Sequence, residues 1–147
     1  MFDALNFPPY TFQIQDADRK KMIFDVVRKK FVILTPEEWV RQHVVHHLIY
    51  DKAYSASLLA VETGIKFNGM IRRCDIVAYK NNAPYLLVEC KAPNIVLNPG
   101  VIAQIARYQS VLKVPYLFIS NGLRHLCLKR NDDGNIEMCE EIPPFHK

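Results

Sequence analysis

The feature that most constrains this chain is a run of three strand-like segments separated by two asparagine-rich turns. Residues 57–67 (SLLAVETGIKF) and 70–79 (MIRRCDIVAY) flank Asn68-Gly69, a pair that strongly favours a two-residue hairpin turn. Residues 84–91 (PYLLVECK) follow the turn at 81–83. The sequence therefore predicts three successive antiparallel strands, and the turn lengths decide which side chains lie together.

The predicted register gathers charged residues on one face of these strands. A two-residue first turn places Glu62 opposite Asp75, and a three-residue second turn places Asp75 opposite Glu89. Lys91, two residues further on, shares that face because strand side chains alternate. A two-residue turn at Asn81-Asn82, or an uncompensated bulge, would instead send Asp75 to the other face from Glu89.

Three carboxylates on one face repel one another unless protonation or a bound cation relieves the repulsion. Glu62, Asp75 and Glu89 offer only oxygen ligands, which suits Mg²⁺ or Mn²⁺. The alternative is that Glu89–Lys91 and Glu62–Arg73 are ordinary ion pairs at a strand end. Spacing alone leaves both interpretations open.

Two helices and further strands complete a predicted α/β fold. Thr35-Pro36-Glu37-Glu38 is typical of a helix start, and the helix is expected to run to about residue 50. Asn98-Pro99 begins a second helix that ends near residue 113. Strands are expected at 115–120, 124–130 and 135–140, and two or three short ones within 11–34. Because several strands are apolar on both faces, we expect a mixed central sheet flanked by helices on both faces.

Composition and short motifs narrow the function classes. The formal charge of +4 permits a polyanionic partner without requiring one. The four cysteines form no CxxC pair and are expected to be small buried residues in a reducing cytoplasm. A signal peptide and an apolar run of about 20 residues are both missing, so we expect a cytoplasmic protein with no membrane partner. Neither a P-loop nor a GxGxxG motif indicates nucleotide binding.

The charged strand segment and the second helix together resemble a known nuclease family. Asp75 followed by Glu89-Cys90-Lys91 resembles the PD-(D/E)xK signature, and QIARY (104–108) resembles the QxxxY element of RecB-like members. With TPEEWVRQ (35–42) and the SNG that ends the strand at 115–120, the chain resembles the N-terminal nuclease domain of type I restriction enzyme R subunits over residues 20–128. Cys74 stands where the superfamily name places proline.

The resemblance implies a restriction-endonuclease-like fold and a set of site residues. Asp75, Glu89 and the backbone carbonyl of Cys90 would hold Mg²⁺ or Mn²⁺, and Lys91 would activate the attacking water or stabilise developing charge. Gln104 and Tyr108 would orient Lys91, contact DNA or support the metal; the alternative is a polar rim beside the core.

Several further residues keep two interpretations. Glu38 is either an acid of the site, as the family's first helix supplies, or the third residue of a capping box; Glu62 has independent support from the hairpin register. Arg41, Arg73 and Arg107 are candidate DNA contacts, with scattered surface charge as the alternative. HVVHH (43–47) is interpreted as a polar helix face rather than a zinc site, because a third ligand is not evident.

The sequence thus predicts one nuclease-like domain over 1–147, with an N-terminal β extension (1–34), a catalytic core (35–130) and a C-terminal hairpin and tail (131–147). The predicted activity is metal-dependent DNA endonuclease cleavage in restriction or DNA processing. The alternative is a non-catalytic nucleic-acid-binding or assembly module that keeps the fold; a structured or RNA substrate is also open. Separately encoded motor or specificity subunits and a homodimer are the protein partners considered.

Overall fold

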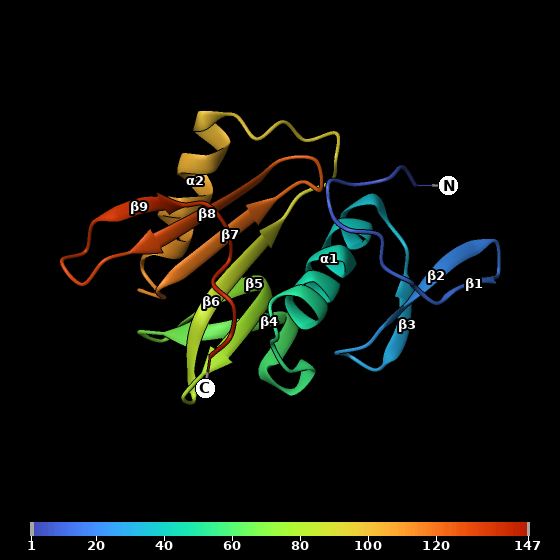
Figure 1. The fold of residues 1–147 in the computed structure, drawn as a ribbon, viewed down its shortest axis with the longest axis horizontal. Helices are drawn as coiled ribbons and strands as arrows, with labels where there is room; N and C mark the ends of the chain where they lie inside the picture. The colour runs from blue at the N-terminus through green and yellow to red at the C-terminus, as the bar shows by residue number, and fades with distance from the viewer. Residues whose placement is uncertain (1, 147) are drawn as a thin grey trace.

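The structure is a computed structural model that describes residues 2–146, and its strands form two separate sheets (Figure 1). Strands β1 (Ile14–Ala17), β2 (Lys20–Asp25) and β3 (Lys30–Ile33) form a small antiparallel sheet. The larger sheet has the order β4-β5-β6-β7-β8-β9 and is antiparallel except for the parallel pair β6 and β7. Its strands are β4 (Leu59–Phe67), β5 (Met70–Lys80), β6 (Ala83–Cys90), β7 (Tyr116–Ser120), β8 (His125–Arg130) and β9 (Ile136–Cys139). The predicted mixed α/β fold is confirmed at this level.

Helix α1 (Pro36–His46) begins where the sequence predicted and continues as a π-helical turn at His47–Asp51. The Thr35 hydroxyl accepts a hydrogen bond from the Glu38 backbone N–H at 3.0 Å, which satisfies one free donor of the first turn. Val40, Val44 and Leu48 are fully buried and pack against Ile76 and Val88 of the large sheet and its other core residues. Figure 1 shows α1 between the large sheet and the small one.

The turn between β5 and β6 differs from the prediction. It has two residues, Asn81 and Asn82, both with positive φ (54° and 62°), so Lys80 pairs with Ala83. A three-residue turn was therefore wrong. However, the pairing shifts by one residue between Ala78 and Tyr79, which leaves Tyr85 as an extra residue in β6. This bulge offsets the shorter turn, so the ladder resumes in the predicted register and ends at Ile76 and Val88, one residue before Asp75 and Glu89.

Helix α2 (Pro99–Ser110) starts at the predicted cap, where the Asn98 side chain accepts from the Val101 N–H at 2.9 Å, and ends about three residues before the expected position. Ile105 packs with Ile119 of β7 and Leu126 of β8 in a cluster distinct from the one under α1. Adjacent residues of β6 enter different clusters: Val88 packs in the cluster of α1, whereas Leu87 packs in a third cluster with Cys74, Val77 and residues that follow α2. Each helix therefore has its own core layer.

Within residues 2–146, neither helix combines the length and the apolar character needed to cross a lipid bilayer.

Candidate functional site

Asp75 lies where β5 leaves its pairing with β6, and both of its carboxylate oxygens are engaged. Oδ2 accepts a hydrogen bond from the Cys90 backbone N–H at 2.7 Å. Oδ1 accepts from the Arg41 Nη2 of helix α1 at 3.0 Å. A backbone donor and a guanidinium from two different elements therefore fix the orientation of this carboxylate.

Arg41 is the centre of a buried ion-pair network. Its guanidinium lies 2.5 Å from Glu38 Oε1, 2.7 Å from Glu62 Oε1 and 3.0 Å from Asp75 Oδ1, and its side chain is only 6% exposed. Burial disfavours the charged form, but the carboxylates of Glu38 and Asp75 outweigh it and raise the pKa of Arg41 above its ordinary value. The single buried guanidinium of Arg41 thus forms ion pairs with three of the predicted acids.

Glu38 supports this network rather than facing an open cleft. Its Oε2 accepts hydrogen bonds from Arg28 and Gln42, each at 2.9 Å, while Oε1 binds Arg41. The backbone N–H of Glu38 donates to the Thr35 hydroxyl, which caps the start of α1. The Glu38 carboxylate is therefore saturated by protein donors, and only its backbone N–H takes part in the cap of α1.

Glu62 reaches the same network through an unusual backbone. Its φ is +52°, and it interrupts the ladder between the pairs Val61–Ile76 and Thr63–Cys74, opposite Asp75 as the register predicted. A left-handed glutamate costs on the order of 1–3 kcal/mol unless its surroundings impose it. Here the gain is the contact between the Glu62 carboxylate and Arg41.

Glu89 and Lys91 lie on the other side of Asp75. The Lys91 Nζ is 3.7 Å from Glu89 Oε1, and the Lys91 backbone N–H donates to the Ser120 carbonyl at 2.9 Å, which ties the end of β6 to β7. Burial, followed by the charge of Asp75, raises the pKa of Glu89 to about 7, and Lys91 only partly offsets this. Glu89 is therefore the acid of the site that lacks a full counter-charge.

An open cleft of about 250 Å³ lies between this strand end and α2. Glu89, Lys91, Gln104 and Tyr108 line it together with two apolar residues of the helix. The guanidinium of Arg72 lies over the Tyr108 ring, 4.2 Å from its centroid. The structure thus brings both residues of the QxxxY element to the lysine and one of the acids.

The predicted site therefore has two halves. Glu38, Glu62 and Asp75 surround Arg41, whereas Glu89, Lys91, Gln104 and Tyr108 share the cleft. Asp75 joins the halves through its hydrogen bond to the backbone of Cys90. The side chain of Cys90 is fully buried and its thiol pKa is raised well above the usual value by burial, so only its backbone is available to the site.

Asp75 and Glu89 carry oxygen donors of the kind that a hard divalent cation prefers. Among residues 2–146, groups of three or more metal-binding side chains do not occur. Mg²⁺, however, is commonly held by one or two carboxylates, with waters and substrate phosphates completing its octahedron. Asp75 and the incompletely neutralised Glu89 supply two such carboxylates.

The candidate DNA contacts lie in different surroundings. Arg73 and Arg107 are exposed, although Arg73 lies 3.5 Å from Glu62. Arg41 is buried, so contact with a phosphate would require it to leave its carboxylates.

Sequence reasoning missed Gln109 of α2, which is only 3% exposed and whose amide nitrogen and oxygen have no hydrogen-bond partner among the described residues. Its spacing of four from the buried Ile105 was the available signal.

His43 and His46 correct the interpretation of HVVHH as a polar helix face. Both are buried, and the Phe12 ring from the N-terminal segment lies 4.7 Å and 4.4 Å from their ring centroids. The His43 Nδ1 lies 2.7 Å from the Trp39 carbonyl oxygen, whereas the ring nitrogens of His46 have no protein partner among the described residues. These histidines belong to an aromatic layer beneath the N-terminal segment.

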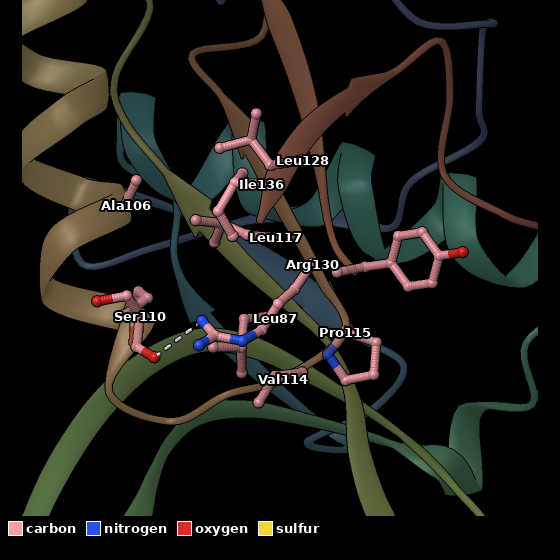
Figure 2. Close-up of a pocket in the computed structure, with 11 residues that line it drawn as sticks. Leu87, Ala106, Ser110, Val114, Pro115, Leu117, Leu128, Arg130 and Ile136 are labelled. Carbon is pink, nitrogen blue, oxygen red and sulfur yellow. Dashed lines mark hydrogen bonds between the residues drawn. The ribbon is translucent and has the colours of Figure 1, made fainter. Parts of the chain in front are cut away.

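A second, smaller pocket of about 60 Å³ lies at the end of α2 (Figure 2). Its lining is mostly apolar, with Leu87, Leu117 and Leu128 among its walls, and the Arg130 guanidinium reaches the Ser110 carbonyl at 3.4 Å across its rim. None of the acids discussed above lines it, so it is separate from the charged cleft.

Fold and site together define a mixed α/β domain with carboxylates and a lysine at the open end of its central strands. The chain belongs to the family described as the N terminus of the type I restriction enzyme R protein, whose model matches residues 36–143. The predicted family is thereby confirmed, and the match begins at the first residue of α1. None of the curated proteins matches the chain.

Proposed function

We propose that the chain is a metal-dependent endonuclease domain that cleaves phosphodiester bonds in DNA, within a restriction system or a related DNA-processing system. The observation that carries this proposal is Glu89. It is a largely buried acid with a pKa near 7, it follows the last β5–β6 pair opposite Asp75, and it shares an open cleft with Lys91. Membership of the restriction R-protein family supports the same activity.

The proposal includes the PD-(D/E)xK fold, with α1 and α2 on opposite faces of the large sheet. Support comes from β6, where Val88 packs in the α1 cluster and its neighbour Leu87 in another. Adjacent strand residues point to opposite faces.

Asp75, Glu89 and the Cys90 carbonyl would hold Mg²⁺ or Mn²⁺. Such an ion, when bound, polarises the scissile phosphate and lowers the pKa of its water. Lys91, 3.7 Å from Glu89, stabilises negative charge on the phosphate in the transition state. Gln104 and Tyr108 line the opposite wall of the cleft and orient the DNA strand there.

Glu38 and Glu62 take part indirectly. They fix Arg41, and Arg41 fixes one oxygen of Asp75. In this proposal the two glutamates are positioning residues. The proposal takes DNA as the substrate and motor or specificity subunits encoded separately as partners, and membership of the R-protein family supports DNA and separate subunits.

A plasmid-nicking assay tests the activity. Wild-type protein is expected to convert supercoiled plasmid to open circles with Mg²⁺ or Mn²⁺ and to be inactive in EDTA. Lys91→Ala and Glu89→Gln are each expected to lose at least about 100-fold of this rate. Lys20→Ala, an exposed change on β2, is the matched control. Absence of nicking by wild type, or equal nicking by Lys91→Ala, contradicts the proposal.

One observation favours a second candidate, a non-catalytic nucleic-acid-binding module. Arg41 already neutralises Asp75 and Glu62, as a permanent substitute for a metal would. This candidate predicts DNA binding in EDTA, no nicking with either ion and no Mn²⁺ signal change in electron paramagnetic resonance titrations.

A further inference from the structure

The outer part of the β4–β5 hairpin extends past the rest of the sheet. β5 pairs with β6 only as far as Ile76, whereas its pairing with β4 continues to the turn at Asn68-Gly69. Residues 63–74 therefore form a two-stranded arm that begins directly beyond Asp75. In Figure 1 the tip of this arm stands clear of the other strands. Five residues of each strand form the arm, residues 63–67 and 70–74, so it is about 17 Å long.

One face of the arm packs against α2 and the residues that follow it. Ile65 and Cys74 join the core cluster that includes Leu112 and Val114 after α2. Arg72 lies over the Tyr108 ring of α2 at 4.2 Å. These contacts hold the base of the arm beside the cleft that contains Glu89 and Lys91.

The other face of the arm is open. The cross-strand pairs Gly64–Arg73 and Lys66–Ile71 share it, and all four residues are exposed. Gly64 leaves room there, because a Cβ at this position would lie 2.5 Å from the Ile71 Cγ2 and would displace that side chain. The absence of a side chain lets Ile71, which is 66% exposed, lie across the strand between the two basic residues.

The positive charge of the arm favours a polyanionic partner. Residues 63–74 contain Lys66, Arg72 and Arg73 and no acidic residue, although the whole chain has 15 acids against 19 bases. A two-stranded ribbon fits the major groove of B-DNA, which is about 12 Å wide. Lysine and arginine neutralise phosphates, and an apolar side chain contacts the sugars and base edges between them.

We propose that this arm binds duplex DNA next to the cleavage site, with Lys66 and Arg73 on phosphates and Ile71 in the groove. The inference rests on the proposed DNA-cleaving function and names the surface that grips the substrate. Because Glu62 and Asp75 lie at the base of the same two strands, DNA held by the arm extends toward the candidate catalytic cleft.

Fluorescence anisotropy with a labelled 20-base-pair duplex in EDTA tests binding apart from cleavage. Lys66→Ala/Arg73→Ala is expected to weaken binding about tenfold or more and to reduce the slope of log affinity against log salt by about two. Lys20→Ala/Lys30→Ala removes the same charge from exposed sites on the small sheet and is expected to leave the slope unchanged. Ile71→Ser is expected to weaken binding without changing the slope.

The outcomes separate this inference from the proposed function. Wild type that binds through the arm but never nicks plasmid overturns the function and supports the arm. Wild type that nicks plasmid while the arm variant keeps its affinity and slope overturns the arm alone. Equal losses in the control pair also overturn it. A dimer in sedimentation that Ile71→Ser dissociates, with DNA binding intact, would assign the arm to a second copy of the chain and overturn the proposal.

Discussion

Replacing Arg41 by methionine tests whether one buried cation holds the acidic half of the site together. Methionine keeps the apolar stem of the side chain and removes only the guanidinium. The wild-type group contacts Glu38, Glu62 and Asp75 within 3.0 Å. After the change, Asp75 keeps only its hydrogen bond from Cys90, whereas Glu38 keeps Arg28 and Gln42.

The expected cost follows from the burial of each partner. Removing one member of a buried ion pair costs about 3–5 kcal/mol. The side chains of Glu38 and Asp75 are 7% and 12% exposed, so their contacts count in full. Glu62 is 39% exposed and Glu37, at 3.9 Å, is 46% exposed, so these two contribute little. Because Glu38 retains two donors, we expect a loss of about 3 kcal/mol in the free energy of unfolding.

Urea unfolding of wild type, Arg41→Met, Asp75→Asn and the double variant measures this cost and the coupling between the two residues. We expect a coupling of about 1–3 kcal/mol, since they share a hydrogen bond. Arg107→Met, on the exposed face of α2, is the control and should change stability by less than about 0.5 kcal/mol. A loss below about 1 kcal/mol for Arg41→Met, or additive behaviour in the cycle, would refute the reasoning.

Two pH-dependence predictions follow from buried titratable groups and have opposite signs. Because the folded pKa of Glu89 is raised from 4.5 to about 7, wild type should lose about 3 kcal/mol of stability as pH rises through that range, and Glu89→Gln should not. Because the folded pKa of His46 is lowered from 6.5 to about 4, stability should fall by about 3 kcal/mol as pH falls through that range, and His46→Phe should abolish this loss. Urea titrations between pH 4 and 7.5 check both as variant-minus-wild-type differences; a flat difference for either variant contradicts the corresponding assignment.

Much of the strand order and of the cleft could be predicted from the sequence, because both depend on local signals. Asn68-Gly69 gave the first turn, and Thr35 and Asn98 gave the two helix starts. The second turn was wrong by one residue, and Asp75 still lies opposite Glu89, just past the last β5–β6 pair, only because a bulge at Tyr85 restored the register. A bulge depends on packing against several strands, and a single strand's pattern of alternation does not reveal it.

The roles of Arg41 and of the histidines could not be predicted from the sequence, because they depend on tertiary contacts. Nothing in RQHVVHH says that Arg41 points to Asp75, 34 residues away, or that Phe12 covers His43 and His46. The left-handed backbone of Glu62 had no signal either, since asparagine and glycine are the usual residues there. In each case the contact that decides the conformation comes from another segment of the chain.

The division of the site into two halves bears on why the fold tolerates so many acids in one place. Glu38, Glu62 and Asp75 carry three negative charges, and Arg28 and Arg41 return two positive charges to them at contact distance. Arg28 is also shared with the buried carboxylate of Asp25, so this half keeps an excess of negative charge, but each of its three acids has an arginine at contact distance. Glu89 has Lys91 at 3.7 Å, and burial, followed by the charge of Asp75, raises its pKa to about 7. Under the proposed function, a cation would therefore interact most strongly at Glu89, which shares its cleft with Gln104 and Tyr108.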